Sequence, residues 1–311
     1  MRMRRLAAVV LNWRTPELTV RAVEALVADG LPPDRVVVVD NGSSDGSGQR
    51  LAGELPHSHV IELEENIGFA RANNAGARAL RSDEGYLFVN SDAFVHLPGS
   101  LERLGDALSD AKVGIAVPRL RNQDLTLQRT VVPASTPLPE LVRAIGLSRL
   151  VPNRLQPALG AHWDHSHSRR IQAAMGAVML VRARAWQQLG GFNERRFMYA
   201  EDLDLFWRAA SLGWRTQFVA EAEFIHLGGA STGLLWDDPA RAAVVAEAQA
   251  DMIRARLSPG RARASLALMS GGAAARALVH RLRGDELAAA TQRAWCRGFL
   301  SPRARARVRP R

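Results

Sequence analysis

Two acidic side chains begin one stretch of the chain and a histidine ends it. Glu201 and Asp202 stand at the start of a run with helical spacing, and His226 closes a run of strand-forming residues. Carboxylates and an imidazole that meet in a fold can hold a divalent metal and supply a proton acceptor. The same acidic pair would also stabilise the first turn of an ordinary helix through its macrodipole. A structural interpretation therefore stands beside the catalytic one.

A second polar cluster lies upstream and favours the catalytic interpretation. The apolar run YLFV leads directly into Asn90, Ser91 and Asp92. Open α/β sheets bind their ligands at the carboxyl ends of strands, where such a cluster would lie. Two polar clusters at strand or helix ends indicate a site more strongly than either cluster alone.

The elements that would position these clusters alternate between strand-like and helix-like patterns. Apolar runs at 6–11, 36–39, 60–63 and 86–89 predict buried strands, and residues 17–28 predict a helix between the first two. This alternation is typical of a mainly parallel sheet flanked by helices, which is an α/β fold. Parallel strands share their carboxyl ends, so one ligand could contact Asp40, the loop at 66–71 and Asp92 together.

Two local motifs are ambiguous when each is considered alone. The segment DNGSSDGSG that begins at Asp40 is neither a Walker loop nor a dinucleotide-binding G-x-G-x-x-G pattern, and by itself it indicates a turn. Residues 117–170 lose regular periodicity and contain His162, His165 and His167. Zinc is disfavoured there because no cysteine supports it, and we expect this segment to contact an acceptor instead.

The composition indicates a folded intracellular chain. It has 311 residues, of which 47% are hydrophobic, and its single cysteine, Cys296, excludes an internal disulfide. A lone cysteine fits a reducing compartment. The apolar run at the N-terminus is short, so we interpret it as a strand and not as a signal peptide. No uninterrupted apolar run reaches transmembrane length.

The positive charge is concentrated at the C-terminal end. Residues 241–311 hold 15 arginines against 4 acidic side chains, whereas residues 1–240 hold 26 basic and 27 acidic ones. We therefore predict one domain over 1–236 and a basic helical region over 237–311, with amphipathic helices at 240–257 and 261–283. Such helices can lie on an anionic membrane surface, although a helical cap with a solvated charged face is the alternative. Nucleic acid is disfavoured because no recognised binding fold accompanies the charge.

Five motifs in order resemble the family-2 glycosyltransferases, and within them the bacterial branch that includes rhamnosyltransferases. These motifs are VVLNW, VVVVDNGSSDGS, ENIGFARANNAG, FVNSDA, and GGFNERRFMYAEDLDLFWR followed by FIHLGGAST. The resemblance covers about residues 5–235 and fades over 117–170. It implies a GT-A fold, a Rossmann-like mixed sheet with a C-terminal helical extension, and an inverting transfer from a nucleotide-sugar donor.

The resemblance also implies a role for each matching residue. Asp202 would be the catalytic base, and Glu201 would orient it or touch the acceptor. Asp92 ends the family's DxD motif and would bind Mn²⁺ or Mg²⁺ together with His226, while Asn90 replaces the first Asp of that motif. Asp40 would bind the pyrimidine of the donor. The complete set of implied donor-binding residues is Asn12, Asp40, Asn66, Gly68, Arg71, Asn74, Asn90 and Asp92.

These implications lead to one main function and two alternatives. The main expectation is transfer of a sugar such as L-rhamnose from a dTDP- or UDP-sugar to a lipid-linked or polysaccharide acceptor. Such an enzyme would be cytoplasmic and peripheral at the inner face of the plasma membrane. The alternatives are a soluble transferase for a small secondary metabolite and a non-catalytic subunit that binds a nucleotide-sugar or serves as a scaffold.

Overall fold

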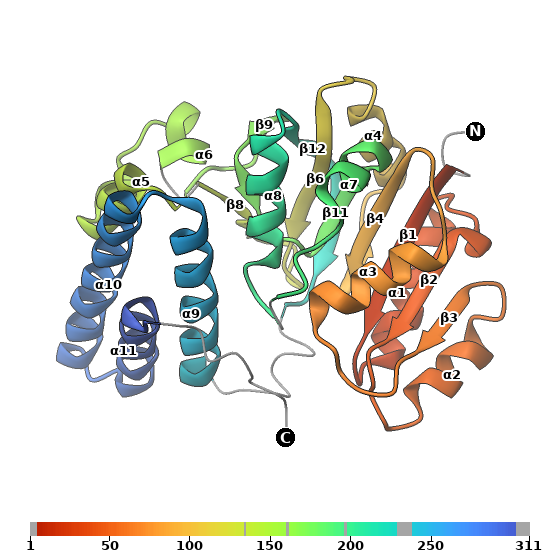
Figure 1. Ribbon diagram of the computed structural model, residues 1–311, viewed down its shortest axis with the longest axis horizontal. Coiled ribbons are helices and arrows are strands. Elements are labelled where there is room, and N and C mark those ends of the chain that lie inside the picture. Colours follow the sequence, from red (N-terminus) through yellow and green to blue (C-terminus); the bar gives the residue numbers. More distant parts are fainter. Residues whose placement is uncertain (1–4, 134, 160–161, 196–197, 229–237, 303–311) are drawn as a thin grey trace. The chain divides into compact units, whose positions relative to one another are not determined.

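A computed structural model describes residues 5–302 except 134, 160–161, 196–197 and 229–237 (Figure 1). The chain divides into two compact units. The first, here called the sheet unit, comprises 1–131, 164–197 and 201–231. The second, the helical unit, comprises 132–163, 198–200 and 232–311. Residues 132–163 thus group with the C-terminal helices, whereas the sequence pattern assigned them to the domain at 1–236.

The sheet unit is built on one mixed sheet whose strand order is β3-β2-β1-β4-β11-β6-β12-β5. Strands β1 to β4 are mutually parallel, and β6 and β12 are parallel to each other, whereas β11 is antiparallel to both β4 and β6. The strands of this path are β1 (Leu6–Asn12), β2 (Val36–Asp40), β3 (His59–Glu62), β4 (Gly85–Asn90), β5 (Ala93–Val95), β6 (Val113–Arg121), β11 (Val178–Arg182) and β12 (Arg215–His226). The shorter strands are β7 (Leu127–Gln128), β8 (Val131–Val132), β9 (Arg169–Ile171) and β10 (Ala173–Ala174). The predicted α/β class with a mainly parallel sheet is confirmed.

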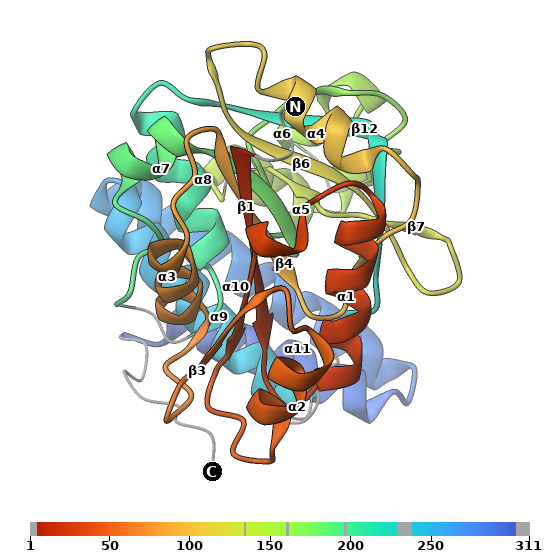
Figure 2. The same cartoon turned by 90° about the vertical axis from the view of Figure 1, so that its right-hand side faces the viewer.

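Helices cover both faces of this sheet, as the continuous apolar runs of its strands require. Helix α1 (Pro16–Ala28) packs on the face that carries Ala8 and Val10. Helix α3 (Phe69–Ala79) packs on the other face, where a Cβ added at Gly76 would lie 2.5 Å from Val9. Figure 2 shows α1 and α3 on opposite sides of the strands. The remaining helices of this unit are α2 (Ser47–Glu54), α4 (Ser100–Ala107), α7 (Ala183–Leu189) and α8 (Glu201–Ser211).

Aromatic side chains fill the face of the sheet that α3 covers. Phe88 lies opposite Val9 in register, and its ring centroid is 4.7 Å from that of Trp186 and 5.0 Å from that of Phe192. Phe192 also meets Phe69 edge-on, at 5.8 Å between centroids. Such aromatic pairs add stability beyond the area that they bury. The cluster joins α7, the start of α3 and the loop before α8 to the central strand β4.

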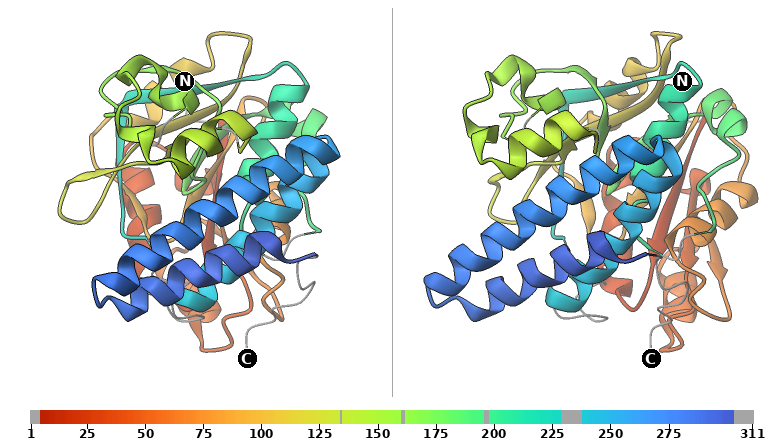
Figure 3. Two further views of the ribbon diagram at one scale, coloured as in Figure 1. Left: turned by 90° about the vertical axis from the view of Figure 1, so that its left-hand side faces the viewer. Right: turned by 60° about the vertical axis from the view of Figure 1, so that its left-hand side comes forward.

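Among its described residues the helical unit contains three long helices and four short helical segments. The long helices lie side by side (Figure 3). They pack so closely that a Cβ added at Gly298 would lie 2.5 Å from Ala246. Predicted helices at 240–257 and 261–283 are confirmed, but α9 buries residues around much of its circumference and is not a simple surface amphipathic helix. The helices are α5 (Pro137–Ala144), η3 (Leu147–Arg149), η4 (Asn153–Leu155), α6 (Gln156–Leu159), α9 (Asp238–Arg256), α10 (Pro259–Leu282) and α11 (Glu286–Leu300). Within the described part of the chain, no helix combines the length and hydropathy needed to cross a bilayer.

Candidate active site

The carboxyl ends of β1 and β2 hold a buried amide–carboxylate pair. Asn12 Nδ2 donates to Asp40 Oδ1 at 2.6 Å, and the two residues are in register at the ends of their strands. Ser43 donates its hydroxyl to the same oxygen and its backbone N–H to Asp40 Oδ2, the latter at 3.2 Å. Asp40 is only 1% exposed. Asn12 and Asp40, which the resemblance assigned to one donor-binding set, are therefore in direct contact.

The bonding of Asp40 limits how it could receive a ligand. A carboxylate oxygen accepts about two hydrogen bonds. Oδ1 already accepts from Asn12 and from the Ser43 hydroxyl, whereas Oδ2 accepts one backbone N–H among the described residues. A donor group on a base would therefore meet Oδ2. Contact between Asp40 and a pyrimidine stays a prediction, in which Oδ2 is the oxygen that would accept the hydrogen bond.

The loop after β3 is tied to the loop after β2 by a pair of asparagines. Asn41 Nδ2 donates to Asn66 Oδ1 at 3.0 Å, and Asn66 Oδ1 also accepts the backbone N–H of Gly68. Gly42 makes this approach possible, since a Cβ there would lie 2.2 Å from the Glu65 carbonyl carbon. Gly68 then leads into α3, on which Arg71 is exposed. Arg71 is thus exposed to solvent, and its contact with a diphosphate stays a prediction.

The side chain of Asn74 links helix α3 to the loop before α8. Its Nδ2 donates to the Phe192 carbonyl oxygen and to Glu194 Oε1, both at 2.9 Å, and its Oδ1 accepts from the Phe192 N–H. Arg208, which lies on α8, donates to the Gly191 carbonyl oxygen in the same loop at 2.8 Å. It also forms an ion pair with Asp204 at 2.7 Å. Direct contact between Asn74 and a nucleotide, which the resemblance implied, would compete with these bonds.

Asp92, which follows the end of β4, faces His226, the last residue of β12. Asp92 Oδ1 lies 3.3 Å from His226 Nε2, and both side chains are more than nine-tenths buried. His226 Nδ1 lies 2.8 Å from Gln128 Oε1. The Gln128 amide nitrogen donates to Asn122 Oδ1 and to the His226 carbonyl, which fixes Oε1 as an acceptor. Nδ1 must then carry a proton, and Nε2 is the ring nitrogen that points toward Asp92.

Asp92 and His226 could supply two of the ligands of a divalent cation. Histidines that bind metals almost always donate their other ring N–H to a fixed acceptor, as His226 does here. A carboxylate and an imidazole are acceptable to Mn²⁺, and a carboxylate to Mg²⁺. Among the described residues no group of three or more His, Cys, Asp or Glu side chains could hold a metal. The remaining ligands would have to come from a bound phosphate and from water.

Asp202 is held by backbone amides at the start of α8. Its Oδ2 accepts the Gly176 N–H at 2.9 Å and its Oδ1 accepts the Leu203 N–H at 2.7 Å. Burial raises the pKa of Asp202, and the amides of Leu203 and Gly176 oppose that rise. A carboxylate with a raised pKa is a stronger base than an exposed one. Glu201 precedes it as the first residue of the helix and is buried.

Hydrogen bonds connect these groups along one edge of the sheet. Thr15 contacts Asn12 Oδ1, and its hydroxyl lies 3.0 Å from that of Ser91, next to Asp92. On the other side, the Asn90 N–H donates to Ala177, the residue that follows Gly176. Hydrogen bonds thus connect the residues around Asp40, Asn90, Asp92 and Asp202 into one region.

The three loop histidines do not form a metal cluster within the described residues. His165 is buried, and its Nε2 accepts the backbone N–H groups of Thr130 and Val131 at 3.3 and 3.2 Å. His167 Nδ1 lies 3.1 Å from the Ser166 hydroxyl. His165 is therefore a core histidine.

Sequence reasoning missed two residues on which the site depends. Gln128 fixes the tautomer of His226, and Gly176 holds Asp202. Gly176 must be glycine, since a Cβ there would lie 2.7 Å from Asp202 Cβ. The dipeptide of Gly176 with Ala177 after an apolar strand was a signal for such a close approach. Gln128 stands in an irregular segment that gives no such signal.

Comparisons with known proteins point to one family. Residues 4–249 match the model of the family described as glycosyltransferase like family 2. An N-acetylglucosaminyl-diphospho-decaprenol L-rhamnosyltransferase of Mycobacterium tuberculosis is 30% identical over 224 residues, which are 65% of this chain and 69% of the relative. The low-salt glycan biosynthesis hexosyltransferase Agl10 of Haloferax volcanii is 29% identical over 211 residues, which are 66% of this chain and 61% of that protein.

Solved structures share the fold. A mannosyltransferase from Pyrobaculum calidifontis, in complex with GDP-Man and Mn²⁺, aligns with a TM-score of 0.58 and 18% identity over 95% of this chain and 85% of its own. The structure of GalNAc-T7 with UDP, GalNAc and Mn²⁺ aligns with a TM-score of 0.51 and 12% identity, over 71% of this chain and 42% of its own. The predicted GT-A type of fold is confirmed by these similarities.

Proposed function

The chain belongs to the glycosyltransferase-like family 2, and we propose that it catalyses an inverting sugar transfer from a nucleotide-sugar to an acceptor hydroxyl. The observation that carries this proposal is the position of Asp202. Its carboxylate has a raised pKa, and Gly176 links it to the strand end that bears Asp92. A base and a diphosphate-binding group in one region are what a single displacement requires.

In the proposed step Asp202 acts as the general base. It accepts the proton of the acceptor hydroxyl from a distance of about 2.6–3.2 Å. The acceptor oxygen then forms a bond to the anomeric carbon of the donor while the bond from that carbon to the diphosphate oxygen breaks. The electron pair leaves with the nucleoside diphosphate. One displacement from the opposite side inverts the configuration, so no covalent enzyme intermediate is needed.

The donor side of the site would be formed by the strand ends. Asp40 would accept a hydrogen bond from a pyrimidine through Oδ2, with Asn12 holding its other oxygen. Arg71 is exposed and would pair with the diphosphate. Asp92 and His226 would hold Mn²⁺ or Mg²⁺, in keeping with the Mn²⁺ in both similar structures. When bound, such a cation neutralises the charge that develops on the leaving diphosphate.

The substrates are proposed from the relatives. The mycobacterial protein is named for transfer of L-rhamnose to a diphospho-decaprenol-linked sugar. We therefore favour a deoxyhexose such as L-rhamnose, carried on dTDP or UDP, and a lipid-linked or polysaccharide acceptor. Such an acceptor would place the enzyme in the cytoplasm, peripherally at the inner face of the plasma membrane. The excess of arginine over acidic side chains in residues 241–311 would favour an anionic surface there.

A nucleotide panel with the full chain tests the donor site. Thermal unfolding is measured with dTDP, UDP and GDP, each with and without Mn²⁺, because a ligand that binds only the native state raises its apparent stability. Stabilisation by dTDP or UDP that depends on Mn²⁺ is expected. If no nucleotide shifts the unfolding temperature under any metal condition, the proposed donor site is wrong. Binding without turnover on any acceptor would instead support the non-catalytic alternative.

A further inference from the structure

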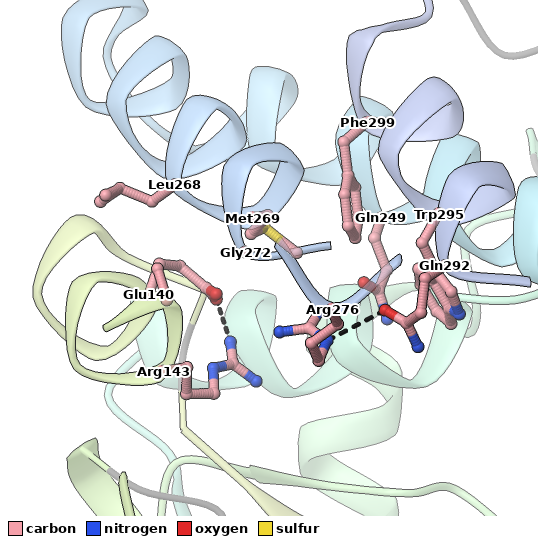
Figure 4. A pocket seen from close by; sticks show the side chains of 11 residues that line it. Glu140, Arg143, Gln249, Leu268, Met269, Gly272, Arg276, Gln292, Trp295 and Phe299 are labelled. Atoms are coloured by element: carbon pink, nitrogen blue, oxygen red, sulfur yellow. Dashed lines mark hydrogen bonds and ion pairs between the residues drawn. The ribbon is translucent and has the colours of Figure 1, made fainter. Parts of the chain in front are cut away.

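A cavity of about 320 Å³ lies wholly within the helical unit. Its walls come from α5, α9, α10 and α11, and Figure 4 shows the side chains that line it. This size falls in the range of small-molecule binding sites. None of the residues discussed for sugar transfer lines this cavity, so it requires another explanation.

The polar part of the cavity holds two arginines and two glutamines together with one carboxylate, Glu140. Arg143 and Arg276 point into the same space, and Gln249 and Gln292 also line it (Figure 4). Arg143 pairs with the buried Glu140, and Arg276 Nε donates to Gln292 Oε1 at 2.9 Å. One acidic and two basic groups leave a formal excess of one positive charge. The cavity is therefore suited to an anion.

The two guanidinium groups lack a full set of partners. Arg143 Nε is buried and has no hydrogen-bond partner among the described residues. Burial is the main cause that lowers the pKa of Arg276, and the positive charge of Arg143 nearby lowers it further. Guanidinium groups bind phosphate oxygens in a bidentate way, and two of them with two carboxamides offer more donors than a planar carboxylate can accept. A phosphate or diphosphate group suits this arrangement better.

The other part of the cavity is apolar. Leu268, Met269, Trp295 and Phe299 line this part. Apolar walls with a few placed polar groups are typical of sites for small molecules. An occupant with both an anionic head and an apolar chain would match both parts of the cavity.

We propose that this cavity binds the phosphate head of a phosphorylated lipid, with Arg143 and Arg276 contacting the phosphate oxygens and the start of the lipid chain lying against the apolar wall formed by α10 and α11. This site goes beyond the proposed sugar transfer and does not depend on it. It would give the helical unit a specific lipid contact in addition to the general attraction of its arginines to anionic surfaces.

Vesicle binding by the full chain tests the proposal with a matched pair of variants. Arg276→Gln removes one charge from the cavity, and Arg263→Gln removes one charge from an exposed position on the same helix, outside the cavity lining. We expect Arg276→Gln to weaken binding to phosphatidylcholine vesicles that contain phosphatidic acid by about tenfold, the effect of one lost charge-assisted hydrogen bond. Arg263→Gln should change it less than about threefold. Equal losses in both variants would show only general charge attraction and overturn the proposal.

A soluble competitor identifies the source of the phosphate. Inorganic phosphate and pyrophosphate are added to the same binding assay at constant ionic strength, with a short-chain phosphatidic acid below its micelle concentration as the comparison. The short-chain lipid should displace the chain from vesicles at a much lower concentration than either inorganic anion, because only the lipid also occupies the apolar part. Equal potency of pyrophosphate and lipid would overturn the lipid assignment. Fluorescence of Trp295 provides a second readout: the lipid-induced change should be lost in Trp295→Phe.

Discussion

At the scale of single residues, the catalytic role proposed for Asp202 is accompanied by a cost to stability. Burial raises its pKa, so the charged form is disfavoured in the folded protein. For such a group the contribution to folding is favourable below the ordinary pKa and is lost as the pH rises through the folded pKa. We therefore expect Asp202→Asn, at neutral pH, to leave the unfolding temperature unchanged or higher while turnover falls by about 10²–10⁴-fold. Thermal unfolding and sugar transfer are measured on the same preparation; full activity in the variant would exclude Asp202 as the base.

The raised pKa of Asp202 also predicts the acid side of the pH profile. A general base works only when deprotonated, so kcat/KM should fall as the pH drops through the pKa of Asp202 in the free enzyme. Because burial raises that pKa, the fall should begin at a higher pH than for an exposed aspartate. The measurement is kcat/KM against pH for the wild type, with the residual activity of Asp202→Asn as the control. A profile that is flat down to the ordinary pKa of aspartate would contradict this assignment.

Gln128 gives a second prediction at this scale. It accepts from His226 Nδ1 and so leaves Nε2 free to bind a metal. Gln128→Leu should weaken Mn²⁺ binding by about 10–100-fold, as is typical when such a supporting hydrogen bond is lost. Gln128→Glu keeps the acceptor and is expected to retain most of the affinity. Mn²⁺ titration in the presence of UDP or dTDP, followed by electron paramagnetic resonance, measures both variants. Equal affinity in Gln128→Leu and the wild type would show that His226 is not a ligand.

From the sequence alone, spatial proximity could be predicted for some of these residues but not for others. Asp40, Asn66 and Asp92 follow parallel strands, and parallel strands fix the edge on which their ends lie. The meeting of Asp92 with His226 was implied by family resemblance, and the structure bears out their proximity. Gln128 was missed because it comes from a two-residue strand in a segment without periodicity. Contacts of this kind depend on tertiary packing, which local patterns do not encode.

At the scale of elements, the loop after β2 depends on a glycine. Gly42 has a φ of +66°, and a Cβ there would lie 2.2 Å from the backbone of Glu65. Gly42→Ala should therefore lower the free energy of unfolding by more than about 2 kcal/mol, through both backbone strain and the clash. Gly53→Ala on α2 meets no atom within 4 Å and should be neutral or stabilising by roughly 0.5–1 kcal/mol. Urea unfolding compares the two variants, and equal stabilities would contradict the close approach of the two loops.

The strands of the first ninety residues and helix α1 could be predicted because each has one clear pattern, whereas no helix was predicted where α2 (Ser47–Glu54) lies. Predicted limits at 36–39 and 86–89 agree within a residue with β2 (Val36–Asp40) and β4 (Gly85–Asn90). The antiparallel insertion of β11 between β4 and β6 could not be foreseen, since a buried apolar strand has the same composition in either direction. Helix α11 (Glu286–Leu300) lies in the region that was expected to be helical, although no separate helix was predicted there.

At the scale of the whole molecule, charge and chemistry are divided between different parts of the chain. Residues 1–240 are nearly neutral and contain all the residues proposed for transfer, whereas residues 241–311 carry the positive excess. Residues 132–163 group with that basic part and contribute α5 to its cavity. A sheet unit for the donor and a helical unit for an anionic lipid would together suit an enzyme whose acceptor is held at a membrane.

This division predicts where a nucleotide should protect the chain from hydrogen exchange. UDP or dTDP with Mn²⁺ binds only the native sheet unit in our proposal, and at a hundredfold excess over Kd it would stabilise that unit by about 2.7 kcal/mol. Slower exchange is expected in segments 36–43, 63–74 and 88–93, which carry Asp40, Arg71 and Asp92, and little change in α10 and α11. The same nucleotide with Asp92→Asn, measured by mass spectrometry under identical conditions, should give much weaker protection in all three segments. Protection confined to α10 and α11 would place the nucleotide in the helical unit, and would contradict both the donor site and the separate role proposed for the cavity.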